Sequence, residues 1–268
     1  MKIVPIGGGL GAQIFAVILV NHLRSEGTYG DIYPDVSYFH QLQPKKAKSG
    51  EGIHIFPWEL GYYGIPLEQF HETLPPKPNW FKRNFLNVPS PQRLEESAAL
   101  RLSLTMDAFK KDWIDIFPIA EHHKNEALKL LTNKNRRTAV VHLRRTDFLN
   151  VASHVVTDSD VLPIMKKMKN IDIERFLFVS DASVPIDFFQ EQIPDITDWA
   201  IVPSEDLFLA HAVMRLAEFL ITSNSQFSLS AALLNKDVMC IIPRVWFGES
   251  HAELNTEINK MASWSILG

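Results

Sequence analysis

The second half of the chain alternates short apolar runs with longer amphipathic stretches. The apolar runs predict strands at 138–143, 175–179, 201–202, 218–222 and 238–242. The amphipathic stretches predict helices at 160–169, 185–192, 205–216, 227–234 and 253–261. Strands and helices that alternate in this way favour a parallel sheet with crossover connections, so this half predicts an α/β domain.

The first half is patterned differently. A short apolar strand is predicted at 2–6, followed by a glycine-rich turn and a helix at 12–24 that is apolar almost all round, which is typical of a buried helix. The region 27–97 shows no clear period and carries a proline cluster, so we expect irregular structure there. Helical patterns follow at 94–104 and 121–132.

A polar, basic break at 133–137 separates the two patterns. We therefore expect two domains, residues 1–135 with an irregular insert and residues 136–268 with a Rossmann-like sheet. No internal repeat is evident.

Composition narrows the class of protein. The chain has 268 residues, of which 46% are hydrophobic and 22% charged, so it can bury a substantial core. Its net charge of -4 gives no global attraction to nucleic acid or to an anionic membrane. The single cysteine, Cys240, excludes an intramolecular disulfide and a cysteine-based metal cluster.

The apolar run 14–20 is too short to span a bilayer. We expect a cytoplasmic protein, or an excised catalytic domain, and leave open a peripheral association with the inner membrane. The sequence does not determine the oligomeric state.

Polar clusters follow three of the predicted strands, at 142–147, 180–181 and 223–226. In open α/β sheets, ligands bind beyond the carboxyl ends of the strands. These clusters are therefore the first candidates for a binding site.

The stretch VVHLRRTDF places His142, Arg144, Arg145 and Asp147 at the end of a buried strand. An arginine presents a planar fork of donors that fits phosphate oxygens. Consecutive strand residues point to opposite sides, so one arginine can face a ligand while the other braces the scaffold, with Asp147 as a possible partner. The alternative is a surface ion pair of little consequence.

The stretch SNSQFS lies between a strand and an apolar helix. Ser225 or a neighbour can cap that helix, and the same geometry presents free backbone N–H groups to an anion. Capping alone remains an equal alternative.

The pattern Gly7-x-Gly9-x-x-Ala12 fits the turn of a dinucleotide-binding fingerprint. That fingerprint also requires a second buried strand that ends in an acid. The corresponding stretch 28–39 contains a proline and no apolar run, so a nicotinamide or flavin site is disfavoured. A turn that is merely tight is the structural alternative.

Three further features favour structural readings. Asp158 and Asp160 could form a metal-binding pair. They lie at the start of a predicted helix, however, and acidic residues are common there because they cap the helix, so we favour capping. His122 and His123 point about 100° apart on a helix and form no metal face. The aromatic-rich region 56–85 reads as core in preference to an acceptor groove. We expect no metal.

Six stretches carry recognisable motifs, in this order: GGGLGAQIF, VVHLRRTDF, His154 with Asp160, FLFVSDA, ITSNSQFSLSAALLN and IIPRVWF. Together they resemble the motifs of the bacterial α1,2-fucosyltransferases. In that family the corresponding stretches read GGLGNQMF, H-x-R-R-G-D-Y, H-G-x-x-x-x-D-Y, F-x-x-F-S-D-D, I-A-N-S-S-F-S-W-W-G-A-W-L-N and I-x-P-x-x-W-F. The matches cover nearly the whole chain.

The resemblance implies transfer of fucose from GDP-fucose to a glycan hydroxyl, α1,2 to galactose, with inversion and without metal or cofactor. It implies an α/β fold of the GT-B type, in which two Rossmann-like domains face each other across a cleft and a C-terminal helix closes the chain. The partners would be the nucleotide sugar and an oligosaccharide acceptor, with no nucleic acid.

The resemblance also assigns roles to residues. Arg144 would clamp the β-phosphate, Ser225 and Gln226 would donate to the diphosphate, and Arg145 would be a brace. The remaining candidates for donor binding are Gly8, Gly9, Gly11, His142, Asp181, Asp206, Asn224 and Phe227. Of these, His142 and an acid near Asp206 would read ribose or guanine. Asp147 and His154 are the candidates for the catalytic base, and the choice between them stays open.

The chain departs from the family pattern at a few positions. Ala12 replaces an asparagine, Thr146 a glycine, and Leu229-Ser230 a tryptophan pair, while Ala210 stands where an acid is expected. The related α1,6-fucosyltransferases carry a threonine like Thr146. Three other hypotheses remain: a transferase for another nucleotide sugar, a GDP-sugar-binding protein without activity, and an NAD(P)- or FAD-dependent oxidoreductase.

Overall fold

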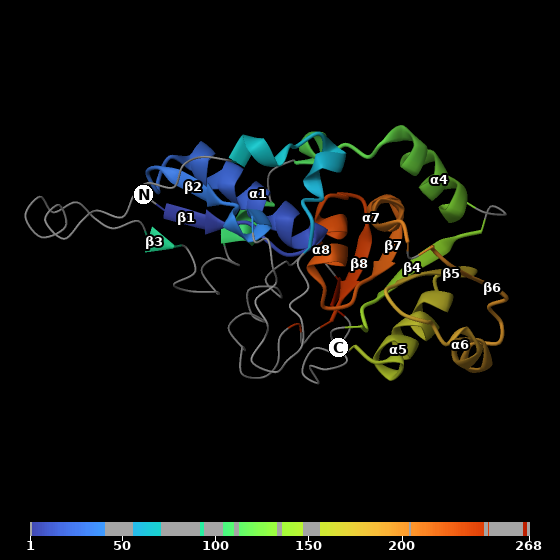
Figure 1. Ribbon diagram of the computed structural model, residues 1–268. Helices are drawn as coiled ribbons and strands as arrows, with labels where there is room; N and C mark the ends of the chain where they lie inside the picture. The colour runs from blue at the N-terminus through green and yellow to red at the C-terminus, as the bar shows by residue number, and fades with distance from the viewer. Residues whose placement is uncertain are drawn as a thin grey trace, which may run out of the picture. The chain divides into compact units, whose positions relative to one another are not determined.

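The computed structural model describes residues 2–40, 56–70, 92–93, 104–109, 113–132, 136–146, 156–203, 205–243, 246 and 265–266. The chain divides into two compact units, an N-terminal unit of Met1–Lys111 and a C-terminal unit of Asp112–Gly268. The division falls earlier than the polar break at 133–137 that the sequence suggested. Figure 1 shows the elements of each unit.

The reason for the earlier boundary is the packing of α4 (Glu121–Leu131) on α7 (Leu207–Leu216). His123 on α4 hydrogen-bonds Asp206, and Arg215 donates to the carbonyl of Phe117, which precedes α4. These contacts join the segment before the break to the C-terminal unit.

The N-terminal unit holds a parallel sheet of three strands in the order β2-β1-β3. The strands are β1 (Lys2–Pro5), β2 (Ile32–Asp35) and β3 (Gln92–Arg93). Helix α1 (Leu10–Glu26) connects β1 to β2, and short 3-10 turns follow at η1 (Ser37–His40), η2 (Leu60–Tyr63) and η3 (Leu67–Phe70).

Helix α1 is buried on nearly all sides, which confirms the prediction from its apolar sequence. Ile14, Ile18 and Leu19 have no exposed surface. The helix ends at Gly27, whose φ of 67° is the left-handed conformation that favours glycine at this position.

The expectation that no second strand follows α1 is wrong. β2 pairs with β1 in parallel register over Ile32–Asp35 and ends in the buried acid Asp35. The strand was not predicted because the sequence has a proline, Pro34, at its centre. A proline is tolerated there because β2 lies at the edge of its sheet, where one side of the backbone needs no ladder hydrogen bonds.

The C-terminal unit contains a parallel sheet in the order β6-β5-β4-β7-β8-β9, which confirms the expected α/β class. Its strands are β4 (Thr138–Leu143), β5 (Arg175–Ser180), β6 (Asp198–Ile201), β7 (Phe219–Ile221), β8 (Met239–Ile242) and β9 (Ser265–Ile266). Besides α4 and α7, its helices are α5 (Asp158–Lys169), α6 (Ile186–Gln192) and α8 (Gln226–Leu233), with a 3-10 turn η5 (Ile114–Ile116).

One face of this sheet is covered by α5 and α6 (Figure 1). Val161 and Met165 of α5 and Phe189 of α6 pack against the alternate strand residues Val141 and Phe178 in one buried cluster. Helix α7 packs against both α4 and α8. The alternating pattern of the sequence thus produces the layered structure it predicted.

The strand order has a direct consequence for ligand binding. β4 comes first in this unit, β5 and β6 lie on one side of it, and β7 to β9 lie on the other. This is the Rossmann order, in which the direction of winding reverses between the first and fourth strands. Ligands bind at the carboxyl ends of the strands at this reversal, here between β4 and β7.

Two predicted helices fall largely outside the described residues. These are the closing helix 253–261 and the stretch 94–104, of which only Leu104 is described, at the start of a helical segment over 104–108. Among the helices that the structure does describe, none has the length and apolar character needed to cross a bilayer.

Candidate functional site

The carboxyl end of β4 carries both arginines of the VVHLRRTDF motif. All six residues of β4 are buried, and the chain emerges at Arg144 and Arg145, whose side chains are 24% and 13% exposed. The sequence predicted that this strand is buried along its length and ends in polar residues, and the structure confirms it.

Arg145 is the brace of the pair. It forms an ion pair with Asp158 in the first turn of α5, while Asp160 and Thr157 complete a capping box at the same helix end. Both acids of the possible metal pair are therefore engaged in structural contacts. The part of the chain that the structure describes contains no group of three or more metal-ligating side chains.

Asp181, which follows β5, shapes the turn that carries Arg144. Its carboxylate accepts from the backbone N–H of Arg145 at 2.7 Å and from the hydroxyl of Thr146 at 2.8 Å. The Nε of Arg144 lies 3.8 Å from the same carboxylate. Asp181 was predicted to bind the donor; its contacts here are with the arginine-bearing turn.

Thr146 is bonded to Asp181 through both its side chain and its backbone. Its hydroxyl donates at 2.8 Å and its N–H at 3.4 Å. The threonine hydroxyl, which a glycine would lack, therefore adds a hydrogen bond to the turn after β4.

A hydrogen bond joins β4 and β7 at the reversal of the strand order. His142 Nδ1 and Ser223 Oγ lie 2.8 Å apart, and both residues are buried. Burial lowers the pKa of His142 to about 3. The nearby Asp181 carboxylate raises this pKa and the Arg144 guanidinium lowers it, but burial has the largest effect. The ring is therefore neutral at physiological pH. The role of His142 in reading ribose or guanine stays a prediction; the structure shows it buried and bonded to Ser223.

The N-terminus of α8 follows directly from β7. Ser225 caps the helix by accepting from the N–H of Phe227 at 3.3 Å. Within the described residues, the N–H groups of Gln226 and Ser228 have no protein acceptor. The side chain of Gln226 is exposed. Both predicted properties of SNSQFS, the cap and the open N–H groups, are present together.

Asn224 leaves a buried acceptor unsatisfied. The residue is 4% exposed, and its Nδ2 donates to the carbonyl of Trp246 at 3.2 Å. Its Oδ1 has no partner within the described chain. A buried acceptor without a partner costs about 1–3 kcal/mol, so a donor from outside the described residues would stabilise this oxygen.

A side chain of α7 contacts α8 near its N-terminus. His211 Nε2 lies 3.1 Å from Ser230 Oγ, and the Ser230 hydroxyl donates to the carbonyl of Phe227. The ring of Phe227 lies near those of both His142 and His211, with centroid distances of 5.8 and 5.3 Å. Ser230 thus has a defined partner.

Asp206 is the N-cap of α7. Its Oδ1 accepts from the N–H groups of Phe208 and Leu209, and its Oδ2 lies 3.0 Å from His123 Nε2. Partial burial raises the pKa of Asp206, but the bonds from Leu209 and His123 outweigh it, so the pKa lies below its ordinary value. A role in reading ribose or guanine stays a prediction.

We expect Asp206→Ala to lower the free energy of unfolding by about 1–2 kcal/mol, because an N-cap is lost. Asp206→Asn should retain most of the stability, since asparagine caps equally well. Urea denaturation of both variants measures this difference. Equal stability of the alanine variant and the wild type would contradict the capping role, and a loss of GDP affinity in both variants would support the ligand role.

The glycine turn of the N-terminal unit is packed by the chain's own aromatic rings. A Cβ added at Gly7 would lie 2.9 Å from Cγ of Tyr38, and one at Gly9 would lie 3.3 Å from the ring of Phe56. Gly8 has a φ of 77°, and Gly11 is buried in the first turn of α1. The tight turn is therefore required by packing, while donor binding by Gly8, Gly9 and Gly11 stays a prediction.

Sequence reasoning missed two polar residues beside this turn. Gln13, which is fully buried in α1, donates to the carbonyls of Gly8 and Pro57 and accepts from the N–H of Glu59. An amide that interrupts the apolar run 10–20 was the available signal for Gln13. Glu59 lies in an irregular segment that gave no signal.

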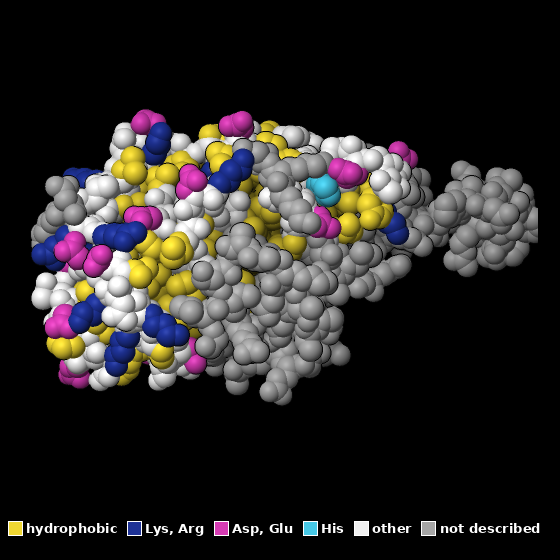
Figure 2. Space-filling model, turned by 180° about the vertical axis from the view of Figure 1, so that it is seen from behind, with side chains coloured by type: hydrophobic (Ala, Val, Ile, Leu, Met, Phe, Trp, Pro, Cys, Tyr) yellow, Lys and Arg dark blue, Asp and Glu magenta, His cyan; other side chains and the backbone are white. Residues whose placement is uncertain are grey.

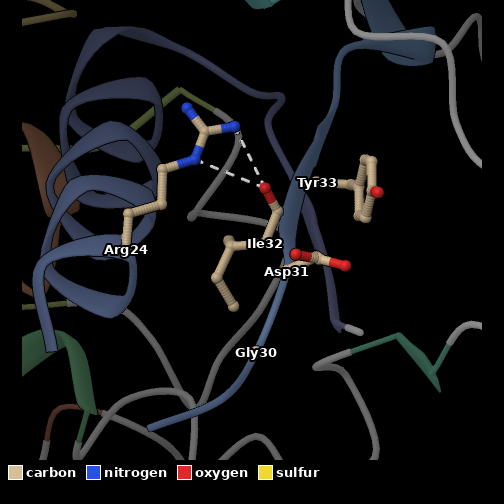
Figure 3. Close-up of a pocket in the computed structure, with 5 residues that line it drawn as sticks. All are labelled: Arg24, Gly30, Asp31, Ile32 and Tyr33. Carbon is tan, nitrogen blue, oxygen red and sulfur yellow. Dashed lines mark hydrogen bonds between the residues drawn. The ribbon is translucent and has the colours of Figure 1, made fainter. Parts of the chain in front are cut away.

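Cavities lined by described residues lie away from the carboxyl ends of β4 and β7. One of about 310 Å³ is lined by Arg24, Gly30, Asp31, Ile32 and Tyr33 at the start of β2. Figure 3 shows Arg24 donating from both Nε and Nη2 to the carbonyl of Ile32, so its guanidinium is already engaged.

A second cavity of about 900 Å³ lies at the amino ends of β4 and β5. Arg136, Arg137 and Lys169 in its wall are each paired with an acid. On the face seen in Figure 2, basic and acidic side chains are likewise interspersed over the described surface. We therefore keep the carboxyl ends of β4 and β7 as the candidate site in preference to either cavity.

Two predicted site residues, Asp147 and His154, lie outside the described residues. The structure brings Arg144, Asp181, His142, Ser223 and the first turn of α8 to one end of the C-terminal sheet. No contact described here joins Asp206 to that group.

Comparison with known proteins gives matches to solved structures only. No protein-family model matches the sequence, and no curated protein matches it significantly. The chain is similar to POFUT1 in complex with GDP, with 13% identity, a TM-score of 0.49, and coverage of 89% of this chain and 96% of that one.

Two bacterial structures match at similar levels. E. coli ADP-heptose LPS heptosyltransferase II has 13% identity and a TM-score of 0.47, over 100% of this chain and 90% of that one. The fucosyltransferase NodZ from Bradyrhizobium has 12% identity and a TM-score of 0.40, over 87% and 92%. At these identities and TM-scores, the matches do not decide function.

Proposed function

We propose that this protein is a glycosyltransferase that moves fucose from GDP-fucose to a hydroxyl of a glycan acceptor. One observation carries the proposal. Arg144 leaves the central strand β4 at the reversal of the strand order, where the His142–Ser223 bond joins β4 to the strand that leads into the open N-terminus of α8.

This arrangement suits a diphosphate. The Arg144 guanidinium supplies a fixed positive charge, and the N–H groups at the start of α8 supply oriented donors. When the bond between the sugar C1 and the diphosphate oxygen breaks, negative charge builds on the leaving GDP. Groups held in advance at that position stabilise the charge as it develops.

The choice of fucose comes from the motifs at 140–148, 176–182 and 221–235, which resemble those of the bacterial α1,2-fucosyltransferases. We extend the proposal to inversion at C1, with the acceptor hydroxyl attacking the face opposite the diphosphate, and to an α1,2 linkage to galactose. A metal is not required in this scheme because Arg144 supplies the charge that a metal would otherwise provide.

The oxidoreductase alternative is less favoured by the glycine turn. Contact with the rings of Tyr38 and Phe56 already accounts for glycine at positions 7 and 9, so neither glycine needs a dinucleotide to explain it. Asp35, at the acid position of that fingerprint, accepts from the N–H of Ser37 in a local turn.

A transfer assay tests the proposal. The protein is incubated with GDP-fucose or ADP-heptose and a panel of galactose-terminated oligosaccharides, and the products are identified by mass spectrometry. We expect a deoxyhexose to be added from GDP-fucose alone, at an unchanged rate with excess EDTA. Binding of GDP-fucose without transfer to any acceptor would favour the silent binding protein, and transfer of heptose would identify another donor.

Gln226→Ala is expected to raise the Kd for GDP a few-fold, about 1 kcal/mol, because one neutral side-chain donor is lost while the backbone N–H groups remain. Isothermal titration calorimetry measures this change. Gln190→Ala, at an exposed position on α6, serves as the control. An unchanged affinity in Gln226→Ala would count against a diphosphate at this helix end.

A further inference from the structure

The segment that leads into α8 is attached to β4. Ser223, which follows β7, lies two residues before the helix cap, and its Oγ is 2.8 Å from Nδ1 of His142 on β4. Ser225 then caps the helix by accepting from the N–H of Phe227. Gln226, the first residue of the helix, is exposed. The direction of its backbone N–H is therefore set by its neighbours in the chain.

A second attachment comes from α7 and lies on the other side of Gln226 in the chain. Nε2 of His211 is 3.1 Å from Oγ of Ser230, and both residues are buried. The Ser230 hydroxyl donates to the carbonyl of Phe227 at 2.9 Å. The ring of His211 also lies 5.3 Å from the ring of Phe227. One side chain of α7 thus acts on the residue after Gln226 by two routes.

The hydrogen atoms in this chain of bonds follow from the chemistry of the groups. Burial holds the pKa of His211 well below its ordinary value, and the Arg215 guanidinium lowers it further, so the ring is neutral and carries one N–H. A serine hydroxyl has a single hydrogen, and that of Ser230 is donated to the carbonyl of Phe227. His211 therefore donates from Nε2 to the Ser230 oxygen.

These two attachments hold a helix end that has unused hydrogen-bonding groups. Within the described residues, the N–H groups of Gln226 and Ser228 have no protein acceptor. Asn224, just before the cap, is 4% exposed, and its Oδ1 has no partner in the same part of the chain. Backbone donors at a helix start bind an anion best when their direction is fixed in advance, since hydrogen bonds weaken steeply when they are misaligned.

We propose that His211 is a positioning residue for the diphosphate of the donor, an inference that rests on the transferase function proposed above. It acts through Ser230 and Phe227 and does not touch the ligand. Its bond to Ser230 keeps the first turn of α8 at the angle at which the N–H of Gln226 points to the diphosphate. Charge that builds on the leaving GDP then meets donors that need no rearrangement. All of these residues belong to the C-terminal unit.

The test uses two variants that break the same bond from opposite ends. Ser230→Ala removes the hydroxyl, and His211→Leu removes the donor while keeping most of the side-chain volume. We expect each variant to raise the Kd for GDP and to lower kcat for fucosyl transfer, both about tenfold, which is the usual effect of losing one hydrogen bond to a charged group. Isothermal titration calorimetry and steady-state kinetics measure these changes. Either variant suffices if the other does not fold.

A control and a rescue separate positioning from a loss of stability. Thr138, at the amino end of β4, is also buried, and its hydroxyl donates to the carbonyl of Leu131 at 2.9 Å. Thr138→Val should lower the Tm about as much as Ser230→Ala and leave the Kd and kcat unchanged. His211→Gln keeps an N–H donor near the place of Nε2, so it should recover most of the affinity and rate that His211→Leu loses.

The possible results distinguish this inference from the function on which it rests. A wild-type Kd and kcat in Ser230→Ala and His211→Leu would show that His211 does not position the diphosphate and would leave the transferase function standing. Equal losses in Thr138→Val, or no recovery in His211→Gln, would reduce the effect to stability and would also overturn the inference. No transfer by the wild type to any acceptor would overturn the transferase function, and the inference would fall with it.

Discussion

Arg144→Ala is expected to lower kcat/KM for fucosyl transfer by at least about 100-fold while the protein stays folded. The loss corresponds to roughly 3 kcal/mol of transition-state stabilisation, the usual effect of removing one group that stabilises developing charge. The fold should tolerate the change, since Arg144 is partly exposed and Arg145, not Arg144, forms the ion pair with α5. Steady-state kinetics and circular dichroism measure the two properties.

Arg137→Ala is the matched control for this prediction. Arg137 precedes the amino end of the same strand, and its ion pair with Glu218 is exposed and therefore contributes little to stability. This variant should retain wild-type kinetics. Full turnover in Arg144→Ala would show that Arg144 does not bind the diphosphate.

Asp181→Ala is expected to lower kcat/KM by about 10-fold to 100-fold, although Asp181 need not touch the ligand. The substitution removes the acceptor for the Arg145 and Thr146 N–H groups and for the Thr146 hydroxyl. Losing hydrogen bonds that hold a turn costs about 1–3 kcal/mol, and here the turn carries Arg144. The effect should fall on GDP affinity and on kcat together.

Two further variants sharpen this test. Asp181→Asn keeps one acceptor oxygen and should lie between wild type and alanine. Asp187→Ala removes an exposed acid of α6 and should leave the kinetics unchanged. Wild-type kinetics in Asp181→Ala would mean that the turn is held by other contacts.

The C-terminal unit was largely predictable because most of its elements follow a clean period; the exceptions are β6, which was predicted at 201–202 and lies at Asp198–Ile201, and β9, which was not predicted. The strand 138–143 was predicted with the bounds it has, since buried parallel strands are apolar throughout and end abruptly in polar residues. The same reasoning predicted that one of the two arginines would be a brace. It did not predict Asp158 as the partner of Arg145, because that contact depends on how α5 packs.

The N-terminal unit was less predictable, for identifiable reasons. β2 is short, lies at a sheet edge and contains Pro34, so it lacks the apolar run by which strands are identified. The contacts of Gln13 with Pro57 and Glu59 join residues that are 44 and 46 positions apart. Local sequence patterns carry no information on such pairings.

The candidate site was also predictable only in part. The position of the site followed from polar residues at strand ends, since the carboxyl ends of parallel strands lie at one edge of a sheet. The roles of individual residues did not follow. Asp181 and Asp206 were predicted to bind the donor, and both have local structural partners that only the folded chain reveals.

A nucleotide at the carboxyl ends of β4 and β7 can be tested by thermal unfolding of the wild type, Arg144→Ala and Arg137→Ala with GDP, GDP-fucose, UDP, GMP and NADH. A ligand that binds only the folded state raises the Tm. We predict that GDP and GDP-fucose raise the Tm of the wild type and of Arg137→Ala, and that neither raises the Tm of Arg144→Ala. A rise with NADH alone, or with none of the five ligands, would contradict the proposed site.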